Sequence, residues 1–137
     1  MYLNLLTEKE QSNFMKMAYL VANIDGDFAK EEKILMSQYE EEMDLSIFLE
    51  EYEIKSLDVD QVIRYFDLSE KKNLRIIFTE LLGLVLSDKK LEKSEKKFVN
   101  KFINYYDISD DFYNEAKTLV GNINNSYKKL NEMIFSE

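Results

Sequence analysis

Apolar residues dominate two stretches of the chain, 14–24 and 76–86, around most of the circumference of a helix. In the first stretch only Lys16 and Asn23 are strongly polar. A helix with so little polar surface is one that other helices surround. The pattern therefore predicts two central, buried helices, at about 8–24 and 69–87, with more polar helices packed around them.

Several start and stop signals place further helices. Thr7-Glu8-Lys9-Glu10 has the form of a capping box, which predicts a helix start near Glu8. Ser69 is expected to cap the second central helix, and Ser56 or Asp58 a short helix that ends near Phe66. Other helices are expected at about 30–43, 93–106 and 110–119, and the pair Gly121-Asn122 is expected to separate a last helix from them.

Both central helices belong to a pattern that occurs twice. A shift of 63 positions places Asp25 on Asp88 without any gap, and between 14–46 and 77–109 it aligns apolar positions such as Val21 with Leu84 and Met36 with Val99. We interpret this as an ancient duplication of a helix, acidic turn, helix unit, although chance matching of helical patterns is the alternative. The sequence thus predicts an all-α, single-domain helical bundle over 1–137, with about 7–8 helices and two pseudo-repeated units related by a pseudo-twofold axis.

The composition narrows the possible chemistry. The chain has 137 residues, enough for one domain with a sizeable core, and it contains no Pro and three Gly. It contains neither Cys nor His, so disulfides, thiolate ligands and His-based catalysis cannot be built from it. Without a nucleophile or a phosphate-binding glycine loop beside the carboxylates, we expect no enzymatic activity.

Charge is unevenly distributed along the chain. The net charge is −9; residues 1–68 carry a net −10 and residues 69–137 a net +1. An acidic half of this kind repels phosphate backbones, so nucleic acid is not an expected partner, whereas a protein partner with a basic surface is. The apolar runs are too short to span a bilayer, and the N-terminus lacks the features of a signal peptide, so we expect a cytoplasmic protein.

The two acidic-turn segments, LVANIDGDFAKEEKILM (20–36) and LVLSDKKLEKSEKKFV (84–99), resemble those of the tellurite-resistance TerB family. The same fold occurs as the N-terminal domain of DjlA-type membrane cochaperones. The resemblance covers about residues 3–109. It implies a TerB-like fold and a non-catalytic module of bacterial stress response that acts beside protein partners. Regulation of a cochaperone partner is one alternative that the resemblance implies.

The first acidic turn is the candidate site. Asp25, Asp27, Glu31 and Glu32 lie within eight residues around a helix N-terminus, and hard cations such as Ca²⁺ bind several oxygen ligands at close range. These residues are therefore candidate ligands for Ca²⁺ or another divalent cation, and a cation-binding sensor is the second alternative function. The spacing does not fit an EF-hand, and capping with the helix macrodipole also explains acidic residues at such a position.

The end of the chain carries a helical apolar stripe of Ile123, Tyr127, Leu130 and Ile134. Two interpretations remain open at this stage. The stripe either closes the bundle as part of the core or forms an exposed ridge that binds a partner.

Overall fold

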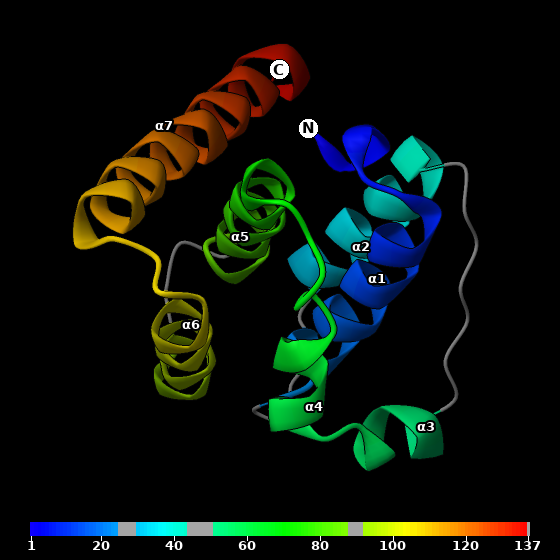
Figure 1. Ribbon diagram of the computed structural model, residues 1–137. Helices are drawn as coiled ribbons and strands as arrows, with labels where there is room; N and C mark the ends of the chain where they lie inside the picture. Colours follow the sequence, from blue (N-terminus) through cyan, green and yellow to red (C-terminus); the bar gives the residue numbers. More distant parts are fainter. Residues whose placement is uncertain (25–29, 44–50, 88–91, 137) are drawn as a thin grey trace.

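The computed structural model describes residues 1–24, 30–43, 51–87 and 92–136, and every regular element in them is helical (Figure 1). The predicted all-α class is thereby confirmed at this level. A short 3₁₀ helix, η1 (Leu3–Leu5), precedes the α-helices. These are α1 (Glu8–Ala22), α2 (Lys30–Met43), α3 (Glu51–Ser56), α4 (Val59–Arg64), α5 (Lys71–Val85), α6 (Lys93–Tyr106) and α7 (Asp110–Phe135).

Helix α5 lies between the two sides of the bundle (Figure 1). On one side it packs against α1, which also contacts α2, α3 and α4. On the other side it packs against α7, while α6 contacts α4. None of the helices in the described ranges is both long and apolar enough to cross a membrane.

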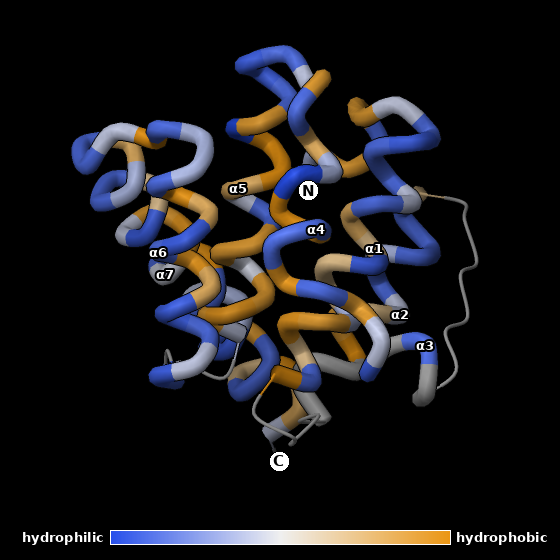
Figure 2. The backbone as a smooth tube through the Cα atoms, turned by 60° about the horizontal axis from the view of Figure 1, so that its bottom comes forward, coloured by the Kyte–Doolittle hydropathy of each residue, from blue (hydrophilic) through white to orange (hydrophobic). Residues whose placement is uncertain are grey.

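The two central helices are the most buried elements, as the pattern predicts. Helix α1 contributes nine buried residues and α5 eight, whereas α6 contributes four and α7 one. In Figure 2 the hydrophobic colouring lies mostly toward the middle of the bundle, where the helices face one another. Aromatic rings extend this core toward α6, where Phe78 stacks on Phe102 with ring centroids 5.9 Å apart.

Local capping explains where several helices begin. Thr7 and Glu10 form the predicted capping box: Glu10 N donates to Thr7 Oγ1 at 3.2 Å and Thr7 N donates to Glu10 Oε1 at 2.9 Å. Asp58 caps α4 by accepting from Gln61 N, and Ser109 caps α7 by accepting from Phe112 N. Each of these bonds satisfies an amide that the helix leaves unpaired.

Two local predictions are wrong. Ser69 does not cap α5; the N-cap is Glu70, and the Ser69 hydroxyl donates instead to Glu10 Oε2 at 2.6 Å. Gly121-Asn122 does not end a helix, because α7 continues through both residues to Phe135. A helical glycine costs only about 1 kcal/mol relative to alanine, which the packing of the preceding turns offsets.

Candidate functional site

Helix α7 is held on the bundle through contacts between Phe112 and Asn124. Phe112 and Tyr113 contact Phe78 of α5 with ring centroids 6.3 Å and 5.9 Å apart, and Ala116 also packs on the core. Val120 is the last residue of this contact and the only buried residue of α7. One turn later Asn124 donates from Nδ2 to the Leu86 backbone oxygen at the end of α5, at 3.4 Å, and the helix then continues for about three more turns to Phe135.

The apolar stripe of α7 does not join the core. Tyr127 is 64% exposed, Leu130 50% and Ile134 65%, and Leu119 at 54% extends the stripe toward the N-terminal half. The interpretation that this stripe closes the bundle is therefore wrong, and the alternative of an exposed ridge describes its position. We define the α7 stripe as Leu119, Ile123, Tyr127, Leu130 and Ile134, which share one face at helical spacing.

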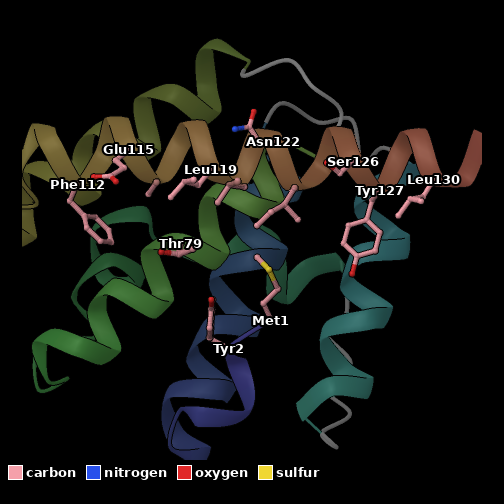
Figure 3. A pocket seen from close by; sticks show the side chains of 13 residues that line it. Met1, Tyr2, Thr79, Phe112, Glu115, Leu119, Asn122, Ser126, Tyr127 and Leu130 are labelled. Carbon is pink, nitrogen blue, oxygen red and sulfur yellow. The ribbon is translucent and has the colours of Figure 1, made fainter.

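An open groove of about 720 Å³ runs along this stripe (Figure 3). Helix α7 forms one wall, and Met1 and Tyr2 lie across from it, with Thr79 of α5 between them (Figure 3). We call it the α7 groove. Its lining is mostly apolar; the polar side chains in it are Thr79, Glu115, Asn122 and Ser126. A lining of this kind suits an apolar ligand surface with few polar contacts.

A buried carboxylate fixes the wall opposite α7. Glu80 of α5 is 3% exposed, and its Oε1 accepts from the Tyr2 amide at 2.8 Å and lies 2.9 Å from the Met1 amine. Glu42 of α2 adds a second ion pair to that amine at 3.1 Å. Charge-assisted bonds to a buried group are stronger than bonds at the surface, so Met1 and Tyr2 are held in place beside the groove.

The electrostatics of this wall follow from the same contacts. Burial on its own lowers the pKa of the Met1 amine, but the hydrogen bonds and charges of Glu80 and Glu42 outweigh it and raise the pKa above its ordinary value. Tyr39 donates from its hydroxyl to the backbone oxygen of Glu80 at 3.3 Å. Burial and then the charge of Glu80 raise the pKa of Tyr39 well above its ordinary value, so it stays neutral.

The acidic turn predicted as a cation site falls mostly on residues that the structure does not describe. Asp25 and Asp27 lie outside the described residues, as do the side chains of Glu31 and Glu32. Gly26 of the same turn also lies outside them. Within the parts of the chain that the structure describes, no group of three or more acidic side chains is placed to hold a metal ion.

Sequence reasoning found one wall of the groove and missed the other. The stripe residues Ile123, Tyr127, Leu130 and Ile134 follow from helical spacing alone, whereas Met1 and Tyr2 carry no local pattern that would place them beside it. Only Glu80, the one charged residue in the apolar stretch 76–86, could have indicated a polar contact there. A scan of protein-family models, a search of curated proteins and a search of solved structures each found no match to this chain.

Proposed function

We propose that this chain is a non-catalytic, TerB-like interaction module that binds an apolar helix of a protein partner in the α7 groove. The observation that carries the proposal is the α7 stripe, five apolar side chains on one helix face that are between 36% and 65% exposed. Its exposed side chains amount to on the order of 500 Å², which lies in the range of the largest apolar patch on a typical monomer, 300–600 Å². Patches of this size frequently mark a binding site.

The form of the groove supports a helix as the ligand. Apolar side chains spaced by three and four residues along a straight helix contact a second helix through the same spacing. The polar groups Asn122 and Ser126 lie at the edge of the stripe, where a bound helix would leave them near solvent. Interfaces commonly combine an apolar centre with such a polar rim.

The TerB-like architecture is the second part of the proposal, and the helix bounds support it. Adding 63 to the bounds of α1 and α2 gives the bounds of α5 and α6, and the N-caps Thr7 and Glu70 are also 63 residues apart. We propose on this basis that the two helix pairs are the repeated units. The total of about 7–8 helices and the boundaries of a single domain stay predictions.

Photo-crosslinking in the native host tests the groove. A photoreactive phenylalanine analogue at position 127 is expected to give an adduct with a protein, and the same analogue at position 125, on the opposite face of α7, is expected to give none. The crosslinked protein is then purified, and its binding is measured by calorimetry against the parent chain and Leu130→Asp. Equal adducts at both positions, or none at 127, would contradict the proposal.

Growth tests address the stress-response part. Deletion of the gene is expected to make the native host more sensitive to tellurite, and the parent gene should restore growth while the Leu130→Asp gene should not. Unchanged growth of the deletion strain on tellurite would end the stress-response part of the proposal and leave the proposed binding in the groove unaffected.

Three further expectations stay predictions from the sequence: that the chain is a cation sensor, that it regulates a cochaperone, and that it is cytoplasmic.

A further inference from the structure

We propose that the helix bound in the α7 groove is α7 of a second copy of this chain, in antiparallel orientation across a twofold axis. This inference rests on the proposed function, because it takes the same groove as a protein-binding site and names its occupant. Three properties of the described residues support it: the order of residues in the stripe, its area and its charge.

The α7 stripe is complementary to itself when reversed. Leu119 and Ile134 lie at its two ends, Ile123 and Leu130 lie inside them, and each pair is symmetric about the midpoint between Ser126 and Tyr127. Two antiparallel copies therefore place Leu119 opposite Ile134 and Ile123 opposite Leu130, while the two Tyr127 rings meet beside the axis. A twofold interface requires this kind of self-complementary surface.

The exposed area matches what such a contact needs. One face of a standard-size interface buries about 800 Å², of which roughly 60% is apolar, so the apolar part is about 500 Å². The α7 stripe supplies an area on that order, and Met1 and Tyr2, each about half exposed, add the opposite wall. The stripe also continues the face through which α7 packs on α5, so a second helix would extend an existing helix–helix contact.

The charge distribution also favours this face for self-association. Two copies that each carry a net charge of −9 repel one another, and the repulsion is least where their surfaces are not acidic. The part of α7 that bears the stripe, 119–135, contains Lys128, Lys129 and Glu132 as its charged residues, and Glu115 also lines the groove. The charges of these four side chains cancel, so this face is not acidic although the whole chain is.

Sedimentation and light scattering test the oligomeric state. The parent is expected to be a dimer at micromolar concentration, and Tyr127→Asp should raise the dissociation constant at least about 100-fold, because two buried positions change per dimer. Asn125→Asp, on the opposite face of α7, should leave the dimer intact. Tyr127 is exposed in one copy, so circular dichroism should show that both variants fold. A monomeric parent, or equal dissociation constants for Tyr127→Asp and Asn125→Asp, would overturn the inference.

Introduced cysteines test the orientation, since the chain has none of its own. Under mild oxidation, Tyr127→Cys should form a disulfide-linked dimer, because positions near the axis lie within bridging distance. Ile134→Cys alone should not, whereas a mixture of Leu119→Cys and Ile134→Cys chains should give the mixed disulfide. Fast self-linkage of Ile134→Cys would indicate a parallel pair and overturn the proposal.

The experiments distinguish failure of the second copy as occupant from failure of the α7 groove as a protein-binding site. A monomeric parent without the Tyr127→Cys crosslink removes the second copy as occupant, and the adduct at position 127 then reports whether a different protein binds there. An adduct with the mass of two identical chains supports both the groove and the second copy. Absence of any adduct, of the parent dimer and of the crosslink overturns both.

Discussion

Asn73 donates from Nδ2 to Oε1 of Glu10 at 2.9 Å, and the two residues are 63 positions apart along the chain. This is the separation that relates the bounds of α1 to those of α5. Both side chains are buried between these helices, at positions where the surrounding residues are apolar. In the proposed repeat, equivalent residues of the two units therefore contact each other directly, which is the arrangement expected beside a twofold axis.

Glu10 combines the capping of α1 with contacts to Ser69 and to Asn73 of α5 in one carboxylate, and this leads to the first prediction. Its oxygens accept from the Thr7 amide, the Ser69 hydroxyl and Asn73 Nδ2. Glu10→Ala removes all three bonds and leaves buried donors unpaired, so we expect the free energy of unfolding to fall by about 2–4 kcal/mol. Urea unfolding measures the change. Glu8→Ala, an exposed residue of the same first turn, should cost less than about 0.5 kcal/mol; similar losses in both variants would contradict this account.

The pH dependence of the same residue is the second prediction. Burial on its own raises the pKa of Glu10, but the hydrogen bonds from Ser69, Thr7 and Asn73 outweigh it and lower the pKa below its ordinary value. The ionised carboxylate is thus favoured by folding, so its contribution is present above the ordinary pKa of 4.5 and is lost as the pH falls through the folded pKa. The difference in unfolding free energy between the parent and Glu10→Gln should shrink as the pH falls below about 4.5. A difference that grows on acidification would show that the sign is wrong.

Adjacent tyrosines of α6 supply a matched pair for the third prediction. Tyr106 donates from its hydroxyl to the Ile63 backbone oxygen and accepts from the Phe66 amide at 3.1 Å, so it ties the end of α4 to α6. Tyr106→Phe leaves both backbone groups unpaired and should cost about 1–3 kcal/mol of unfolding free energy. Tyr105 donates to Asp67 at the surface, and Tyr105→Phe should change stability by less than about 0.5 kcal/mol. Equal melting temperatures for the two variants would refute the role given to Tyr106.

Sequence and structure agree where local chemistry decides, as the Thr7 and Glu10 capping box shows. Apolar circumference likewise identifies α1 and α5 as the buried helices. Ser69 shows where local reasoning fails: its position before a helix predicts a cap, but a buried carboxylate 59 residues away takes its hydroxyl instead. No pattern within a few residues contains that information.

The candidate site divides in the same way. Helical spacing identifies the apolar residues of α7, but whether they are covered depends on where α5 ends relative to α7. The position of α7 on α5 is set by tertiary contacts such as those of Phe78 with the aromatic rings of α7, and the place of Met1 and Tyr2 by those of Glu80. The sequence therefore predicts the stripe, and only the fold determines that it lies open beside a groove.

Gly121 carries the fourth prediction. It lies inside α7, and a Cβ built on it meets no atom within 4 Å. Gly121→Ala should therefore raise the unfolding free energy by about 0.5–1 kcal/mol, because alanine loses less backbone entropy in a helix. Gly83→Ala in α5 is a useful comparison, since its added methyl would lie 3.8 Å from the Tyr39 hydroxyl, an ordinary contact. A fall in unfolding free energy for Gly121→Ala but not for Gly83→Ala would indicate that the helix breaks at Gly121. That break is the sequence prediction that the structure contradicts.

The last prediction concerns the wall of the α7 groove that Met1 forms. The pKa of its amine is raised above the ordinary value of 8.0 by Glu80 and Glu42, which outweigh burial. The charged amine is thus favoured by folding, so its contribution is complete below pH 8.0 and is lost as the pH rises through the folded pKa. Glu80→Gln keeps an acceptor for the Tyr2 amide but removes the negative charge.

The unfolding free energies of the parent and Glu80→Gln should therefore differ most near neutral pH and converge as the pH rises above the folded pKa of the amine. Glu115→Gln, an exposed carboxylate of the same groove, should show no such pH-dependent difference from the parent. Because Met1 lines the groove, the parent should also bind its occupant more weakly over the same rise in pH, whereas Glu80→Gln should bind with little pH dependence. A constant stability difference from neutral to alkaline pH would mean that the Glu80 carboxylate stabilises the fold by some contact other than the Met1 amine.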